Sequence, residues 1–442
     1  MLARLVLAAL AVRVVVLALT YVAPRALALR DYPENQRSCA SFLQLVTRRP
    51  ECVVLAEDEI GNDALGRSIA SGQGYRLAQR WVIAAPGTPT AYGGFLYPAF
   101  VGAVYAATHD DTLALFLVQA LIGALAVGGV ALAAFRLGGE RAALAAGVLA
   151  AIHPGLALDS AWVMSEALAV PLLLAAWLLW VRYLERPSAA RAAAFGAVAA
   201  AACLTRSPSF YALGLMILLS LPRRGLAWRP LAGQLAAGLV VFAACVAPWA
   251  ARNARVFHAF VPLDTKAGAN LWMNDHPSAH PWREVWDGAP DPDPPPLPVP
   301  GLDEAAADRY FRGLALDYVR RQPLTFAGVS AFRLGLELVP VPRWWGRWPA
   351  ARAAAAALYL ALTWLALAGL WRVRRQAAGR ALIGIAAGWM VMMAFTAVGL
   401  RHRLAAEWAF TAAAGVALAA WPAWAGRRAA APPPPPPQTA RP

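Results

Sequence analysis

Residues 112–135 read TLALFLVQALIGALAVGGVALAAF, an apolar stretch without a single charge. A helix of roughly 20 such residues spans the hydrocarbon core of a bilayer. Comparable stretches recur along the 442-residue chain, of which 60% is hydrophobic and only 15% charged. A soluble domain needs a larger polar surface than that. The sequence therefore predicts an all-α, polytopic membrane protein.

Clusters of arginine between the apolar stretches predict the orientation of the spans. Cytoplasmic loops carry an excess of Lys and Arg, which assigns to the cytoplasm the clusters within 136–141, 182–191, 223–229, 372–380 and 427–428. The spans are then about 2–22, 112–135, 142–159, 165–183, 189–205, 208–222, 231–250, 351–371, 379–399 and 404–425, or about ten helices with both termini inside. Segments 93–107 and 326–341 begin and end outside, and we expect them to be helices at the outer interface.

The two ends of the chain need separate interpretations. A cleavable signal peptide is the alternative for residues 2–22, because Ala26-Leu27-Ala28 resembles a cleavage site. Arg13 interrupts the apolar run and favours an uncleaved span. The run from Pro432 to Pro437 predicts a disordered cytoplasmic tail at 426–442, behind one membrane domain at 1–425.

Charge and cysteine content bear on two questions: whether the protein binds nucleic acid and whether it contains a disulfide. The net charge of +15 would suit nucleic acid, but no basic stripe with interleaved aromatic residues forms a platform, so no nucleic-acid partner is predicted. Cys203 and Cys245 lie in apolar segments and are expected to be small core residues. Cys39 and Cys52 share the first polar insert, where a disulfide is permitted if the insert is extracytoplasmic.

The predicted topology gathers five polar features on the outer side of the membrane. They are far apart in the sequence: the insert 23–92, the turn 153–166, the turn 205–207, the loop 251–325 and the triplet 401–403. The loop holds a proline-rich run and a predicted amphipathic helix at 303–321 that stops at Pro323. Polar features on one membrane face are expected to form a membrane-embedded active site.

Carboxylates and arginines are the reactive groups that this face offers. Glu57-Asp58-Glu59 begins a predicted helix at 59–71, and a carboxylate held near hydrocarbon becomes a better general base. Arginines at the same level suit a phosphate, which is a leaving group that needs no general acid. No P-loop, dinucleotide fingerprint or catalytic triad is present. Pro277 interrupts the pair His276 and His280, so no metal site is assigned.

A series of short motifs runs along nearly the whole chain. They are Asp58-Glu59 with Gly72-Gln-Gly74-Tyr75, Phe95-Leu96-Tyr97-Pro98, His153-Pro154 with Ser165-Glu166, Leu204-Thr205-Arg206, Pro248-Trp249 with Arg252-Asn253, Gly268-Ala-Asn270-Leu271-Trp272, and Arg401-His402-Arg403 with Glu407. In this order they resemble the motifs of the GT-C glycosyltransferases, in particular bacterial relatives of dolichyl-phosphate-mannose protein mannosyltransferases and of the lipid A aminoarabinose transferase. Asn62 and Gly66 stand where the family has tyrosine and alanine, and His402 replaces an aromatic residue.

The resemblance implies a GT-C-like fold and an inverting transfer of sugar from a polyprenyl-phosphate donor to a lipid, glycan or protein acceptor. It implies a bacterial inner membrane protein with its active site on the outer face. Asp58 is then the general base. The substrate-binding candidates are Glu59, Glu166, Arg206, Arg252, Asn253, Arg401 and Arg403. A divalent metal requirement stays open.

Other interpretations of the same residues stand beside this one. Asp58 also suits an N-cap, and Glu59 a solvated or structural residue. Glu166 suits a cap or ion pair at the end of a span, and Arg206 and Arg252 suit interfacial anchors. For the whole chain, a transporter or flippase of an anionic or lipid-linked substrate is the alternative, although transporters place charges near the midplane and carry inverted repeats. A relative that only binds or scaffolds is the third.

Overall fold

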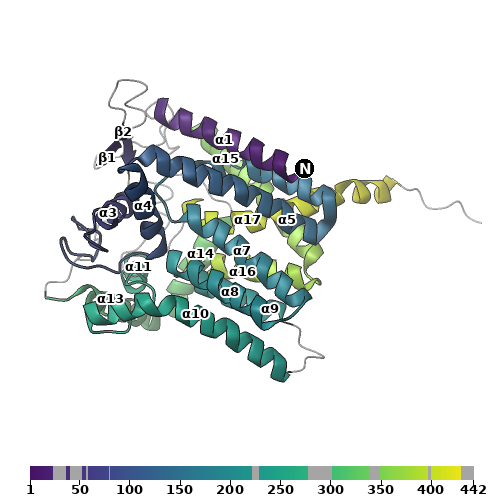
Figure 1. The fold of residues 1–442 in the computed structure, drawn as a ribbon. Helices are drawn as coiled ribbons and strands as arrows, with labels where there is room; N and C mark the ends of the chain where they lie inside the picture. Colours follow the sequence, from purple (N-terminus) through teal and green to yellow (C-terminus); the bar gives the residue numbers. More distant parts are fainter. Residues whose placement is uncertain are drawn as a thin grey trace, which may run out of the picture.

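The computed structural model describes residues 1–22, 36–39, 52–55, 58–78, 80–221, 228–276, 301–338, 349–396 and 400–429. The sequence around the candidate cleavage site, the proline-rich run at 290–300 and most of the predicted tail lie outside these ranges. Figure 1 shows a bundle of long helices with short helices gathered at one end of it.

The long helices of the bundle follow the predicted spans closely. They are α1 (Leu2–Val22), α5 (Thr112–Ile152), α7 (Glu166–Glu185), α8 (Ala189–Thr205), α9 (Ser209–Ser220), α10 (Trp228–Phe257), α15 (Pro349–Val373), α16 (Ala377–Ala394) and α17 (Leu400–Ala429). Among the described residues, seven helices are long and apolar enough to cross a membrane: α1, α5, α7, α10, α15, α16 and α17. The chain is therefore an all-helical integral membrane protein apart from one short ribbon, and the number ten stays a prediction.

The helix α5 is two antiparallel arms joined at Gly139. This glycine has a φ of 79°, in the left-handed region that other residues avoid. A Cβ added to Gly147 would lie 3.3 Å from the Cβ of Ala131. In a straight helix the rise over these 16 positions would separate them by about 24 Å. The two arms correspond to the separately predicted spans 112–135 and 142–159.

Two contacts join predicted cytoplasmic turns to one another. Arg136 Nη1, beside the Gly139 turn, lies 2.6 Å from Glu185 Oε1 at the end of α7. Gln376, before α16, donates a hydrogen bond to the carbonyl of Leu137 over 3.4 Å. The turns that carry the first, second and fourth arginine clusters therefore share one end of the bundle, as the topology requires.

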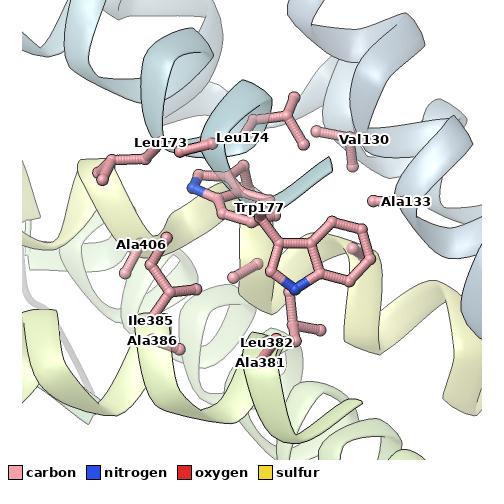
Figure 2. Packing of buried hydrophobic residues seen from close by; sticks show 14 of the residues in the cluster. Val130, Ala133, Leu173, Leu174, Trp177, Ala381, Leu382, Ile385, Ala386 and Ala406 are labelled. Atoms are coloured by element: carbon pink, nitrogen blue, oxygen red, sulfur yellow. The ribbon is translucent and has the colours of Figure 1, made fainter. Parts of the chain in front are cut away.

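The centre of the bundle is packed with tryptophan against small residues. Trp177 of α7 lies among Val130 and Ala133 of α5 and the side chains of Leu382 and Ile385 of α16 (Figure 2). Glycines let neighbouring helices touch: a Cβ on Gly196 of α8 would overlap a carbonyl oxygen of α10. Small residues at helix contacts are how membrane helices gain close packing.

Cysteines separate into one core residue and one surface residue in the described bundle. Cys203 on α8 is buried, as predicted. Cys245 on α10 is exposed, so its assignment to the core is wrong. The reason is position, because α10 lies at the margin of the bundle and only 11% of its span is buried (Figure 1).

The remaining helices lie mostly at the other end of the bundle (Figure 1). They are α3 (Asp58–Ala70), α4 (Leu96–Thr108), α6 (Pro154–Leu158), η1 (Asp159–Ala161), α11 (Ala267–Asn274), α13 (Glu304–Arg321) and α14 (Pro323–Leu338). The four helices predicted at 59–71, 93–107, 303–321 and 326–341 are present as α3, α4, α13 and α14. Asp303 caps α13 by accepting a hydrogen bond from the amide of Ala306.

A two-stranded ribbon, which the sequence interpretation missed, sits in the first polar insert. The strand β1 (Gln36–Cys39) pairs antiparallel with β2 (Cys52–Leu55), and the run Val53-Val54 in β2 has the β-branched side chains that strands favour. In this register Cys39 is directly opposite Cys52.

We predict that Cys39 and Cys52 form a disulfide. Paired residues of antiparallel strands have α-carbons about 4.5–5.5 Å apart, within the roughly 4.4–6.8 Å that a disulfide bridges. Closing this short loop should stabilise the insert by about 2–4 kcal/mol. Mass spectrometry of non-reduced peptides checks it, with Cys203 as the thiol expected to stay free. Two free thiols at 39 and 52 in protein from an oxidising compartment would refute the bridge.

Candidate functional site

The acidic turn of α3 separates one partly exposed carboxylate from two buried ones. Asp58 keeps 27% of its side chain exposed, whereas Glu59 and Asp63 are buried. Glu59 accepts a hydrogen bond of 2.9 Å from the amide of Val163. Asp63 pairs with Arg67 at 2.8 Å within the same helix. Of these three acids, Asp58 thus has the most exposed side chain.

The two departures from the family pattern have structural explanations in α3. Asn62 donates a hydrogen bond of 3.0 Å to the carbonyl of Val163, the residue whose amide donates to Glu59. Gly66 faces Val101 of α4, whose side chain would overlap an added Cβ. The first residue fixes α3 to the segment before α7, and the second lets α3 and α4 touch.

Lys266 lies beside Asp58, although 208 positions separate them in sequence. Its Nζ is 3.5 Å from Asp58 Oδ2. The same ammonium faces two aromatic rings, 5.6 Å from the ring centroid of Trp81 and 5.3 Å from that of Tyr92. Trp81 packs against Gly61 of α3, where an added Cβ would overlap the indole. Trp81, one of the two rings beside the ammonium, is therefore positioned by the helix that begins at Asp58.

A second ion pair joins the end of α8 to the start of α7. Arg206, which follows α8, has its Nη1 2.5 Å from Oε1 of Glu166, the first residue of α7. The same nitrogen donates to Ser165 Oγ over 3.2 Å. The guanidinium also lies over the ring of Trp389 at 5.6 Å. The structure thus brings together two candidates that the sequence named separately, with Glu166 in an ion pair at the start of its span and Arg206 as its partner.

Asp264 connects these two ion pairs. It accepts hydrogen bonds from the side chain of Ser207 and from the backbone amide of Lys266. Desolvation raises the pKa of Asp264 above its ordinary value, while these two bonds and the charges of Lys266 and Arg206 oppose the rise. The sequence interpretation missed Asp264 and Lys266. The signal that would have singled out the second is that it is the chain's one lysine.

Arg252 holds the loop that follows α3. Its guanidinium donates to the carbonyls of Thr90 at 2.7 Å and Tyr75 at 3.3 Å, and it stacks over Trp249 at 4.9 Å. Its neighbour Asn253 is fully buried and donates to the carbonyl of Val261 over 3.0 Å. Both residues organise the outer loops from the end of α10.

Glu304, at the start of α13, ties the first polar insert to the loop 251–325. Its carboxylate accepts hydrogen bonds from Thr90 and Ala91 of the first loop and from Thr265 of the second. Burial raises the pKa of Glu304, and these three bonds act against the rise. Thr265 precedes Lys266, so this clamp fixes the backbone that carries the lysine.

Four residues further along α13, Asp308 holds the start of α11. It accepts a hydrogen bond of 2.6 Å from the amide of Gly268, and burial raises the pKa of Asp308 to about 6. A Cβ on Gly268 would overlap the carbonyl oxygen of Asp308. The glycine of the Gly268-Ala-Asn270 motif is therefore required by helix contact.

Arg403 and Glu407, two residues of the motif near the start of α17, lie inside the bundle. Arg403 has no exposed surface. Its Nη1 donates to the carbonyls of Glu337 and Leu338 at the end of α14, and its Nε lies 2.5 Å from Glu407. Glu407 is also 3.4 Å from Nε2 of His153. The side chain of Arg401 lies outside the described residues, so its role stays a prediction.

Among the residues that the structure describes, no three His, Cys, Asp or Glu side chains come together as a metal site. Asp58, Glu166, Arg206 and the missed Asp264 and Lys266 instead form a connected polar layer beside α3, α7 and α8. Such a layer offers a base and cations next to a membrane-facing bundle.

Comparison with known proteins shows a family similarity over part of the chain and a shared fold. Residues 93–251 match the family model described as Dolichyl-phosphate-mannose-protein mannosyltransferase. An oligosaccharyltransferase from Archaeoglobus fulgidus, solved with Zn and sulfate, aligns over 95% of this chain and 49% of its own, with 15% identity and a TM-score of 0.50. The chain therefore shares its fold with this oligosaccharyltransferase, and its residues 93–251 are similar to the dolichyl-phosphate-mannose-protein mannosyltransferases.

Two further comparisons give a second solved structure and one search without a match. ArnT from Cupriavidus metallidurans, solved with undecaprenyl phosphate, aligns over 84% of this chain and 74% of its own at 16% identity, with a TM-score of 0.41. A search of curated proteins gives no match. The chain spans about half the length of the oligosaccharyltransferase.

Proposed function

We propose that this protein transfers a sugar from a polyprenyl-phosphate donor to an acceptor on the outer face of a bacterial inner membrane, with Asp58 as general base. The observation that carries the proposal is the contrast within one cluster of acids. Glu59, Asp63 and Glu166 are buried and bonded to protein groups, whereas Asp58 keeps 27% of its side chain exposed beside a cation. The mannosyltransferase family match supports the donor class.

The proposed step is a single displacement at the anomeric carbon. Asp58 accepts the proton of an acceptor hydroxyl or amine as the acceptor's lone pair forms the new bond to that carbon. The bond from the carbon to the phosphate oxygen breaks, and its electron pair leaves with the lipid phosphate. One attack from the opposite side inverts the anomeric centre. The leaving phosphate keeps its negative charge, so nearby cations stabilise it.

The other candidate residues divide between substrate contact and support. Arg206 is partly exposed and held by Glu166, an arrangement that aims a guanidinium at a ligand anion. Arg252 keeps the loop 75–90 in place and is a positioning residue with Asn253. Glu59 positions α3 through Val163.

The arginine distribution supports an orientation of the site toward the outer face. Cytoplasmic turns collect Lys and Arg, and the turns joined by Arg136 and Gln376 lie at one end of the bundle. The polar layer around Asp58 lies at the end where α3, α11 and α13 gather (Figure 1). An outer site would meet a donor whose lipid tail stays in the bilayer.

Deletion of the protein tests the function directly. We expect one lipid-linked sugar to accumulate and one glycan or glycolipid to lose a residue, because the donor is no longer consumed. Quantitative mass spectrometry of lipid extracts and surface glycans measures both, and re-expression of the wild-type chain is the control. An unchanged profile would contradict the enzyme and favour the transporter or scaffold interpretation.

A further inference from the structure

Lys266 is the only lysine in a chain that has 40 basic residues, the other 39 being arginines. Arginine serves throughout the chain at the cytoplasmic turns, in buried pairs and at loop anchors. Arginine and lysine are not equivalent: arginine is a planar fork, whereas lysine is a compact point charge on a flexible stem. The single position where the chain uses lysine is beside the proposed catalytic base.

The backbone around Lys266 is fixed from several sides. Thr265 donates to Glu304 through its hydroxyl and to the carbonyl of Ala91 through its amide. The amide of Lys266 itself donates to Asp264 over 3.2 Å. These bonds hold the stem of the side chain in place, while 25% of the side chain stays exposed. The partly exposed ammonium therefore lies on a backbone that hydrogen bonds hold on both sides.

The neighbouring arginines lack this freedom. Arg206 is bonded to Glu166 at 2.5 Å and to Ser165, and Arg252 is bonded to the carbonyls of Thr90 and Tyr75. The contact between Lys266 Nζ and Asp58 is looser, at 3.5 Å. Trp81 and Tyr92 flank the ammonium and favour a cation at that point.

We propose that Lys266 binds the phosphate of the lipid-linked donor and couples donor binding to the release of Asp58. This inference rests on the proposed function. Without donor, the ammonium pairs with the Asp58 carboxylate and weakens it as a base. When the donor binds, the three N–H donors of the ammonium turn toward the phosphate oxygens. With this ion pair broken, Asp58 is a stronger base toward the proton of the acceptor, and Lys266 itself gives up no proton.

The uniqueness of Lys266 allows a test that needs no sugar transfer. An amine-reactive acetylating reagent has two targets in the full-length chain, Lys266 and the amino group of Met1. Purified protein is labelled in detergent with undecaprenyl phosphate, with undecaprenol, or with neither, and labelling rates are read by peptide mass spectrometry. At ten times its Kd, undecaprenyl phosphate should slow labelling of Lys266 about tenfold. The rate at Met1 should not change.

The two lipids separate phosphate binding from burial by the lipid tail. Undecaprenol should give little protection because it lacks the phosphate. Equal protection by both lipids, or protection by neither, would overturn the proposal. If undecaprenyl phosphate protects Lys266 while no donor sugar is ever transferred, the phosphate site stands and the proposed function fails.

Variants provide the second arm of the test. Lys266→Met should raise the KM for the donor about 10- to 100-fold, the loss expected for hydrogen bonds to a charged group. Lys266→Arg should restore much of the binding because it keeps the charge. Arg309→Met, which removes an exposed cation of α13, should leave KM unchanged. A folded Lys266→Met protein with a wild-type KM would overturn the assignment.

Discussion

Replacing Asp58 by asparagine should lower the rate of sugar transfer about 10²- to 10⁴-fold, the usual loss when a general base is removed. Asparagine has the same shape and the same capacity to begin a helix, so α3 should still form. The partly exposed position of Asp58 also means that little packing depends on its charge. Transfer from a lipid-phosphate donor by purified protein is the measurement, with thermal stability recorded on the same sample.

A matched variant controls for the loss of one outer carboxylate. Asp317→Asn removes an exposed acid of α13 that pairs with Arg321, and it should leave transfer unchanged. If Asp58→Asn transfers sugar at nearly the wild-type rate, Asp58 is not the base. Glu166 is then the next candidate, although it is buried and paired with Arg206.

Replacing Arg403 by methionine should destabilise the protein by about 3–5 kcal/mol, because removing one partner leaves a buried charge uncompensated. The charge left behind is Glu407, which has 1% of its side chain exposed and, among the described residues, keeps His153 at 3.4 Å as its ion-pair partner. The variant also removes the donor to the carbonyls of Glu337 and Leu338, where a cation suits the end of α14.

Stability of the Arg403→Met protein is measured by denaturation in detergent, and the loss of the helical circular-dichroism signal reports unfolding. Arg182→Met, at an exposed position near the end of α7, is the control and should change stability by less than about 1 kcal/mol. A stable Arg403→Met protein with weakened donor binding would contradict the structural role. It would return Arg403 to the set of phosphate ligands.

Elements that depend on local sequence were predictable. The apolar runs predict the spans, and the charged residues on either side of Gly139 mark the boundary between the two arms of α5. The helix α13 is marked by its cap at Asp303 and by Pro323 after it. Each of these signals lies within one stretch of chain, where hydrophobic period, capping and breakers act directly.

The partners of the site residues were not predictable, because they come from distant segments. Nothing near Arg403 in the sequence indicates that the end of α14 will cover it, so the sequence alone suggests a phosphate ligand there. Asp58 and Lys266 meet only because both outer loops fold onto α13. Burial is also a property of the whole bundle, which is why the apolar pattern predicts Cys203 correctly and Cys245 wrongly.

Glu304 has a consequence for how such proteins can diverge or be engineered. One carboxylate bonds to Thr90, Ala91 and Thr265. The first polar insert and the loop 251–325 are therefore expected to change together rather than separately. A chimera that exchanges a single loop with a relative would disturb one or two of the three donors to this carboxylate and would displace Lys266 relative to Asp58. Grafting a new acceptor preference onto this scaffold therefore requires moving both loops together with the start of α13.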